Sequence, residues 1–446
     1  MIALNWCLTM VFSRKNKDVK IVLLLFILVG CQIASAQPYT SYFTGNTTDV
    51  DTIGQGGICL MGGATEDDNA MIWFLERANE GDVLVLRASG SDGYNDYMFN
   101  QLGVTLNSVE TIVCSSAAAS DETYVQQAIE DAEAIWFAGG DQWDYVSYWR
   151  NTAVDSLINW GIQNKGLVVG GTSAGMAIQG EYYFSAENGT VTSATALGNP
   201  YVNNVTVDNT PFIQHDILTN TITDTHYDNP DRKGRHVTFL ARMVTDNGLT
   251  FAQGIACDEY TAVCIDENGI AKVYGGHPTY DDNAYFIRVN CDNIGTGHEP
   301  ENCTSGNPLD WNRSNTALQV YEVKGTASAN NSFDLNDWTS ATGGQWESWW
   351  VNQGTLNEAS SSQIDCTAGF TDHEHHFTIY PNPAQDQLLV ESVSVGMFKI
   401  YDLSGKIHLK GTLESGLIDI ENLVPGAYML EITAISFTAN QKFIKE

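Results

Sequence analysis

The chain of 446 residues has few basic residues, with 21 Lys and Arg against 54 Asp and Glu, for a formal net charge of −33. An acidic surface repels phosphate backbones and anionic lipids, so the composition argues against nucleic acid and anionic membranes as partners. No Cys-x-x-Cys pair is present, which argues against a zinc ribbon. The apolar run at residues 21–30 is too short to span a bilayer. We expect neither a cofactor nor a bound metal.

The first 36 residues have the pattern of a signal peptide. Basic residues at 14, 15, 17 and 20 precede the apolar run, and the small residues Ala34-Ser35-Ala36 follow it. This order predicts cleavage after Ala36. Leu28-Val29-Gly30-Cys31 also resembles a bacterial lipobox, which would make a lipidated Cys31 the first mature residue. Both alternatives take the protein out of the cytoplasm.

Seven of the nine cysteines lie beyond this leader. Cys257 with Cys264 and Cys291 with Cys303 are close enough in sequence to pair in an oxidising compartment. Cys59 and Cys114 lie in apolar runs, where we expect buried thiols.

From residue 37 to 276 the sequence predicts an α/β catalytic domain. Short apolar runs alternate with stretches whose apolar residues recur at helical spacing, which is typical of βαβ units. The predicted strands are residues 58–61, 83–86, 111–114, 134–138 and 167–169, and the predicted helices are 68–79, 121–132 and 154–163. We therefore expect a parallel sheet with helices on both faces.

Glycine-rich turns follow the predicted strands at residues 62–64, 90–93, 139–141 and 170–171. Ligands of parallel α/β sheets bind at the carboxyl ends of the strands. The turns therefore mark the edge of the sheet where we expect the functional site.

Three further segments follow. Residues 277–362 are rich in Asn, Thr, Ser, Gly and Trp and are interpreted as an elaboration of the catalytic domain, and residues 363–376 form a polar linker. Residues 377–446 contain short alternating strands at about ten-residue spacing, separated by turns, which predicts a small all-β sandwich.

This last segment resembles the C-terminal sorting domain of proteins exported by the type IX secretion system. The resemblance rests on Tyr380-Pro381-Asn382-Pro383-Ala384, on residues 400–406 and 423–428, and on the basic ending at 442–445. It implies the secretion machinery as a partner and a secreted or cell-surface location. The alternative is an ordinary carbohydrate-binding or adhesive module.

The stretch Gly171-Thr172-Ser173-Ala174-Gly175 follows a predicted strand and precedes a small-residue segment that could begin a helix. Gly-x-Ser-x-Gly at such a corner is the pattern of a nucleophile elbow, in which a strained backbone exposes the serine hydroxyl. The amide after the serine then points to where an oxyanion forms. The alternative is a glycine-rich turn with a passive serine.

A nucleophilic serine needs a base within hydrogen-bond reach. His226 follows a short predicted strand whose loop would return the imidazole to the edge of Ser173. His215 and His236 are the nearest rivals. His373, His375 and His376 lie in the polar linker. An alternative interpretation of this histidine cluster is a metal site.

The chain from about residue 57 to 243 resembles the cyanophycinases and aspartyl dipeptidases. Four motifs carry the resemblance: Gly62-Gly63-Ala64 with Asp67-Asp68, Phe137-Ala138-Gly139-Gly140-Asp141-Gln142, the turn at Ser173, and Asp224-x-His226-Tyr227 with its trailing arginines. This family consists of serine peptidases on a flavodoxin-like or class I glutamine amidotransferase-like fold.

The resemblance implies a role for each matching residue. It implies Ser173 as nucleophile and His226 as general base, with the N–H groups of Gly140 and Ala174 forming the oxyanion hole. It places Gln142 and Asp224 in the substrate pocket. It also implies an acid between the serine and the histidine, where Glu181, Glu187, Asp208 and Asp216 are candidates, and Glu187 lies about where the motif would put it.

Arg232 and Arg235 are candidates for binding a carboxylate, because a guanidinium group can donate two hydrogen bonds to it. They suit a substrate with an aspartyl side chain or a free carboxylate, and the alternative is a solvated surface. Here the chain departs from the family, since residues 228–231 insert between the histidine and the arginines.

The sequence therefore predicts a secreted serine peptidase that hydrolyses aspartyl or isoaspartyl peptide bonds. An α/β-hydrolase esterase is an alternative, although no His-Gly-Gly-Gly stretch is present. A non-catalytic surface protein that binds peptide or glycan is another. A homodimer is compatible with either enzyme.

Overall fold

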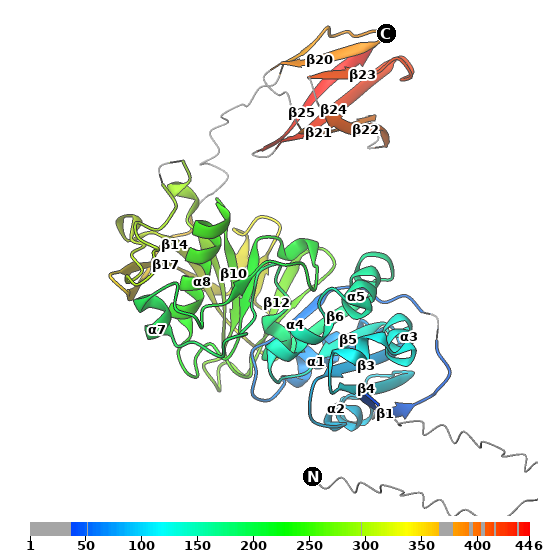
Figure 1. Ribbon diagram of the computed structural model, residues 1–446, viewed down its shortest axis with the longest axis vertical. Helices are drawn as coiled ribbons and strands as arrows, with labels where there is room; N and C mark the ends of the chain where they lie inside the picture. The colour runs from blue at the N-terminus through cyan, green and yellow to red at the C-terminus, as the bar shows by residue number, and fades with distance from the viewer. Residues whose placement is uncertain are drawn as a thin grey trace, which may run out of the picture. The chain divides into compact units, whose positions relative to one another are not determined.

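The computed structural model describes residues 37–50, 52–295, 297–364, 378–391, 396–402, 406–413, 416–434 and 437–446 (Figure 1). The expected leader with Cys31 and Ala36 and the linker histidines lie outside the described residues. No helix in the described ranges combines the length and the apolar character needed to cross a membrane.

The largest sheet in residues 37–364 has ten strands in the order β1-β4-β3-β5-β6-β2-β11-β12-β15-β16. Its strands are β1 (Tyr39–Gly45), β2 (Ile58–Met61), β3 (Asp82–Arg87), β4 (Ser108–Cys114), β5 (Ala134–Phe137), β6 (Val168–Thr172), β11 (Ala262–Ile265), β12 (Ile270–Tyr274), β15 (Ser332–Asp334) and β16 (Ala341–Thr342).

This sheet is mixed. The five strands predicted from the apolar runs, β4, β3, β5, β6 and β2, pair in parallel. β1 at one end and β11 at the other pair antiparallel to them, as do the strands beyond β11. The expectation of a parallel sheet therefore holds for the centre only, because segments distant in sequence add antiparallel strands at both sides.

Helices cover both faces of the parallel centre. Along β3, Val83 and Val85 pack in one apolar cluster with α1, while Leu84 and Leu86 pack in another with α3, α4 and α5 (Figure 1). This alternation follows from the two-residue period of a strand. The helices are α1 (Asp68–Glu76), α2 (Gly93–Asp96), α3 (Thr123–Asp131), α4 (Gln142–Trp149), α5 (Ala153–Asn164), α6 (Ala174–Ala177), α7 (Ser193–Gly198) and α8 (Lys233–Asn247).

The second sheet has six strands in the order β18-β17-β14-β13-β10-β9. They are β9 (Thr221–Asp224), β10 (Gln253–Cys257), β13 (Asn283–Val289), β14 (Leu318–Lys324), β17 (Gly344–Asn352) and β18 (Thr355–Ser360), and β7 (Tyr183–Phe184) with β8 (Val207–Asp208) forms a separate pair. β9 and β10 are parallel, and the other neighbours are antiparallel. Residue 276 is the expected end of the catalytic domain, yet each of the two large sheets contains strands from both sides of it.

The two sheets pack against each other through one apolar cluster. Ile58 and Leu60 of β2 and Val263 of β11 meet Ile255 of β10 and Phe286 of β13 in it. α8 covers the opposite face of the six-stranded sheet, where Trp349 is fully buried. The tryptophan-rich segment therefore supplies core on that face.

The C-terminal segment has two small antiparallel sheets, β19-β20-β23 and β22-β21-β24-β25, around their own apolar core. The strands are β19 (Thr378–Tyr380), β20 (Gln387–Glu391), β21 (Gly396–Asp402), β22 (Ile407–Leu413), β23 (Leu417–Asp419), β24 (Gly426–Ala434) and β25 (Phe437–Lys445).

The cysteine pairs expected from the sequence are wrong. Cys257, Cys264 and Cys303 are free thiols, and so are Cys59 and Cys114, all of them buried. Cys291 is disulfide-bonded, but Cys303 is not its partner. Closeness in sequence did not bring either pair together, because Cys257 and Cys264 lie on strands of different sheets.

Candidate active site

Ser173 lies at the corner between β6 and α6, with backbone angles φ 53° and ψ −112°. The glycines around it leave room for this turn. A Cβ at Gly171 would lie 2.6 Å from the backbone of Gly175, and one at Gly175 would lie 2.1 Å from the carbonyl oxygen of Phe137. The structure thus has the strained strand-to-helix turn that the Gly-x-Ser-x-Gly pattern predicts.

The imidazole of His226 lies beside this serine. His226 follows β9 with a positive φ of 47°, and its Nε2 is 2.8 Å from Ser173 Oγ. The chain therefore brings together the two residues expected as nucleophile and base, from β6 of the ten-stranded sheet and β9 of the six-stranded sheet.

The carboxylate that contacts the histidine belongs to Glu259. Its Oε1 is 2.6 Å from His226 Nδ1, and Asn229 Nδ2 donates to its Oε2 at 3.2 Å. Glu187, the acid expected from the sequence, is exposed on the turn after β7, and its amide donates to Ser185 Oγ. The acid that faces the histidine is thus corrected from Glu187 to Glu259.

Glu259 is held as a carboxylate. Burial raises its pKa, but the hydrogen bonds from His226 and Asn229 outweigh burial, and the pKa lies below its usual value. A carboxylate at Nδ1 accepts the proton of that nitrogen. This leaves the lone pair of Nε2 directed at the serine hydroxyl.

Three carbonyls at the end of β2 hold these segments in register. The carbonyl of Met61 accepts from the amide of Ser173 at 3.1 Å, that of Gly62 from His226 at 2.8 Å, and that of Gly63 from Tyr260 at 3.1 Å. Gly63 has φ +124°, and a Cβ there would lie 2.4 Å from the His226 ring. Gly62 and Gly63 therefore position His226, one by accepting its amide and the other by leaving room for its ring.

The expected oxyanion hole adjoins the serine. A Cβ built on Gly139 would lie 3.7 Å from Ser173 Cβ, so the 139–140 turn runs alongside the hydroxyl. Within the described residues no acceptor bonds the Gly140 amide. The amide of Ala174 opens α6, directly after the serine. Gln142 begins α4, and its Nε2 donates to the carbonyl of Phe184 at 3.4 Å.

Asp224 and Arg235 do not face this opening, although the sequence suggested both as substrate ligands. Their side chains are 2% and 3% exposed and form a bidentate ion pair, in which Arg235 Nε donates to Asp224 Oδ2 at 2.9 Å. A substrate would have to break this pair to reach either group. Both assignments are corrected to a structural role between β9 and α8.

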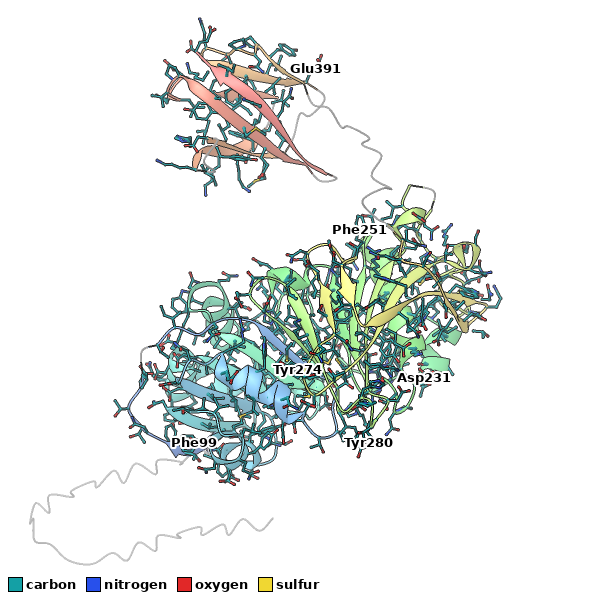
Figure 2. The ribbon with its side chains drawn as sticks, turned by 180° about the vertical axis from the view of Figure 1, so that it is seen from behind. Phe99, Asp231, Phe251, Tyr274, Tyr280 and Glu391 are labelled. Carbon is teal, nitrogen blue, oxygen red and sulfur yellow. The ribbon has the colours of Figure 1, made fainter. Side chains whose placement is uncertain are left out.

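Arg232 remains available. It is half-buried, and its Nη1 donates to the carbonyl of Thr225, the residue before His226, at 3.1 Å. Burial and the nearby charge of Arg235 lower its pKa to about 10. In the described part of the chain it has no carboxylate within ion-pair distance. The loop of residues 228–231 lies at the surface before it, with Asp231 labelled in Figure 2.

The rival histidines are buried away from the serine. His215 Nε2 is 2.9 Å from Gln179 Oε1, and His236 Nδ1 is 3.2 Å from the hydroxyl of Tyr227. Burial lowers the pKa of His215 to about 3 and that of His236 to about 4. Both side chains are therefore uncharged near neutral pH and are part of the buried core.

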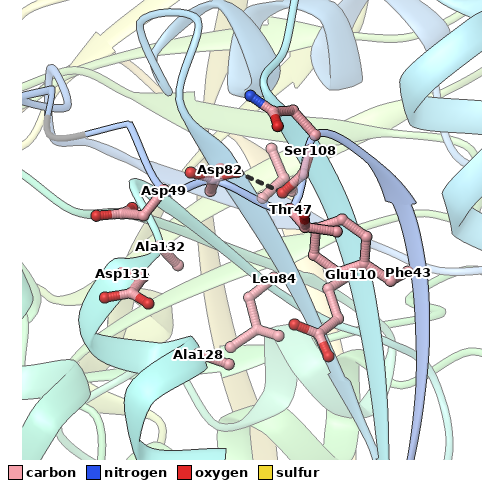
Figure 3. Close-up of a pocket in the computed structure, with 12 residues that line it drawn as sticks. Phe43, Thr47, Asp49, Asp82, Leu84, Ser108, Glu110, Ala128, Asp131 and Ala132 are labelled. Carbon is pink, nitrogen blue, oxygen red and sulfur yellow. Dashed lines mark hydrogen bonds between the residues drawn. The ribbon is translucent and has the colours of Figure 1, made fainter.

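Two hollows lie at opposite edges of the large sheet. One of about 320 Å³ is at the carboxyl ends of β2 and β3, lined by Thr65, Glu66, Arg87, Gly93, Tyr94 and Tyr97. The other, of about 80 Å³, lies at the start of β3, where the hydroxyl of Ser108 donates to Asp82 (Figure 3). Only the first opens at the edge that carries Ser173.

The sequence held a signal for Glu259 that our prediction did not use. The apolar run Ile255-Ala256-Cys257 is followed at once by Asp258-Glu259, in the manner of a strand that ends in a functional turn. β10 is parallel to β9, so their carboxyl ends meet. The resemblance implied an acid between the serine and the histidine, whereas Glu259 follows the histidine in sequence.

Comparison with known proteins confirms the two resemblances. Residues 87–273 match the family model of peptidase family S51, and residues 378–446 match that of the secretion system C-terminal sorting domain. The chain is 23% identical over 211 residues to cyanophycinases of Trichormus variabilis and of a Nostoc species, which is 46% of this chain and 62% of each relative. It thus spans less than two thirds of the length of these curated relatives.

A crystal structure of a peptidase from an acI-B1 Actinobacterium aligns with 52% of this chain and 90% of its own, at 14% identity and a TM-score of 0.36. The sorting domain indicates export through the type IX secretion system to the cell surface or the surroundings.

Proposed function

From a chain that matches peptidase family S51 over residues 87–273 and carries a secretion sorting domain, we propose an exported serine peptidase that cleaves aspartyl or isoaspartyl peptide bonds. The observation that carries the proposal is the continuous hydrogen-bonded series Ser173 Oγ, His226 and Glu259, with distances of 2.8 and 2.6 Å. This is the arrangement that activates a serine hydroxyl.

The reaction follows from the geometry. His226 Nε2 takes the proton of Ser173 Oγ as the oxygen attacks the scissile carbonyl carbon. Glu259 stabilises the imidazolium that results. The amides of Gly140 and Ala174 bind the oxyanion, the strained turn keeping the second amide aimed at it. His226 then protonates the leaving amine, and a water molecule, deprotonated by the same nitrogen, hydrolyses the acyl-enzyme.

We assign the preference for aspartyl substrates chiefly to Arg232. Arg232 is half-buried, and its Nη1 donates to the carbonyl of Thr225, the residue before His226. Its other guanidinium donors have no hydrogen-bond acceptor among the described residues, so it suits the carboxylate of an aspartyl residue. The hollow lined by Glu66 and Arg87 also lies at the carboxyl ends of the strands and would hold the rest of the substrate. Gln142, at the rim beside Gly140, completes this side of the site.

Purified mature protein incubated with cyanophycin and with matched α-aspartyl and β-aspartyl dipeptides tests the proposal. We expect cleavage of at least one class, and covalent labelling of Ser173 by a fluorophosphonate probe. Ser173→Ala should abolish both while leaving the circular dichroism spectrum unchanged. Full turnover by that variant would refute the proposal, as would hydrolysis of aryl esters without any peptide cleavage.

A further inference from the structure

Two free thiols face each other across the edge between β2 and β11. Cys59 and Cys264 are directly opposite in the antiparallel register, and their Sγ atoms are 3.7 Å apart. Both side chains are fully buried. Opposite residues of an antiparallel pair hold their Cβ atoms about 4.5–5.5 Å apart, close to the spacing that a disulfide spans.

The compartment favours oxidation of this pair. The sorting domain takes the protein out of the reducing cytoplasm, and Cys291 of the same chain is disulfide-bonded. We propose that Cys59 and Cys264 form a cross-strand disulfide when the protein is exported, and that this bond fastens the strand that supports the candidate active site.

The position of the bond gives it this role. Cys59 lies two residues before Met61, whose carbonyl, with those of Gly62 and Gly63, accepts the amides of Ser173, His226 and Tyr260. Cys264 lies five residues after Glu259, which contacts His226. A bond between the two sulfurs would join the strand that holds the histidine backbone to the segment that holds its carboxylate.

The oxidation balances with a disulfide oxidant. A thiolate of one cysteine attacks a disulfide of a thiol–disulfide oxidoreductase, the second cysteine displaces that partner, and two electrons and two protons pass to the oxidant. Burial raises the pKa of the Cys264 thiol well above its usual value. The exchange therefore takes place as the strands pair during folding, before the sulfurs are covered.

Cys257 is the competing partner and is oriented elsewhere. It lies on β10 of the other sheet, and its Sγ donates to the carbonyl of Leu60. The register thus pairs Cys264 with Cys59 and leaves Cys257 as a thiol.

Peptide mapping of the exported full-length protein decides between the alternatives. The protein is alkylated in denaturant without reductant, digested and analysed by mass spectrometry. We expect one peptide that links residues 59 and 264, two hydrogens lighter than the separate thiols, with Cys114 alkylated as the internal control. Alkylation of both Cys59 and Cys264 would overturn the proposal, as would a peptide that links Cys257 with Cys264.

A second measurement tests the role of the bond. We expect reductant to lower the melting temperature of the wild-type protein by several degrees more than that of Cys59→Ser/Cys264→Ser, because the disulfide of Cys291 is present in both proteins. Cys114→Ser is the matched control, since it removes a buried thiol from the same sheet and should keep the sensitivity to reductant. An equal effect of reductant on the double variant would show that another bond is responsible.

Discussion

The two sheets of residues 37–364 contribute to the candidate site in different ways. The ten-stranded sheet provides the serine from the end of β6, through a turn whose glycines have steric reasons that can be read in the sequence. The six-stranded sheet provides His226 and Glu259 from the ends of β9 and β10. The proposed nucleophile is therefore positioned by a local motif, whereas the proposed base and acid depend on how a second sheet packs against the first.

The docking explains why the end of β2 matters. Its three carbonyls accept amides from a turn of the first sheet and from two loops of the second. The apolar cluster around Leu60 and Ile255 holds the sheets together directly beneath. The proposed catalytic role of the three residues thus needs both local strain and tertiary packing.

The largest effects on kcat should come from Ser173 and His226, which meet at the contact between the two sheets. Ser173→Ala and His226→Ala are each expected to lower kcat by about 10⁶-fold, and the double variant no further, because the two act as one unit. Steady-state kinetics on the best dipeptide measure this. Additive losses would mean that the two side chains act separately.

Glu259→Gln should reduce kcat by about 10³–10⁴-fold, because an amide no longer favours the tautomer with a free Nε2 lone pair. Glu187→Gln is the matched control and should retain wild-type kinetics, since Glu187 is exposed and the carboxylate at His226 Nδ1 is that of Glu259. The reverse result would return the acid to the segment between serine and histidine.

The buried pair tests the second sheet on its own. Asp224→Asn leaves Arg235 charged and unmatched in the core and is expected to cost about 3–5 kcal/mol of unfolding free energy. Asp224→Asn/Arg235→Met should recover part of this loss. Urea unfolding of the three proteins measures it, and an undiminished stability of Asp224→Asn would place the pair at an open surface.

Arg232 separates substrate recognition from chemistry. Arg232→Ala is expected to raise KM about 10–100-fold for dipeptides with a free aspartyl carboxylate and to leave kcat within a few-fold. The matching peptide with an amidated side chain should bind both proteins alike. A uniform fall in kcat for both substrates would give Arg232 a structural role instead.

The strands and turns of the ten-stranded sheet could be predicted from the sequence better than those of the six-stranded sheet. Continuous apolar runs reveal the buried parallel strands, and Gly171 and Gly175 reveal the turn. After residue 277, the apolar residues at 285–290 and 317–324 indicate strands, and β13 and β14 lie there, but the pairing of these strands with β10 depends on tertiary contacts. For the same reason the chain showed Asp224 and Arg235 as polar residues near His226, but not that they neutralise each other.

Asp258 offers the most specific test of the second sheet. It is buried next to Glu259. Burial raises its pKa to about 7, although Asn283 donates to its Oδ2 through the backbone amide at 3.1 Å and through Nδ2 at 2.9 Å. Its Oδ1 has no hydrogen-bond partner among the described residues.

The sign of the resulting pH dependence follows from the proton count. Between the unfolded pKa of 3.8 and the folded value of about 7, the folded state keeps a proton that the unfolded state has lost. Stability should therefore fall as pH rises through this interval, by up to about 1.4 kcal/mol per pH unit, and level off above it. Asp258→Asn cannot ionise, so its stability relative to wild type should rise from pH 4 to pH 7. Urea unfolding at each pH measures the difference, and a constant difference would mean that the carboxyl is hydrated and titrates normally.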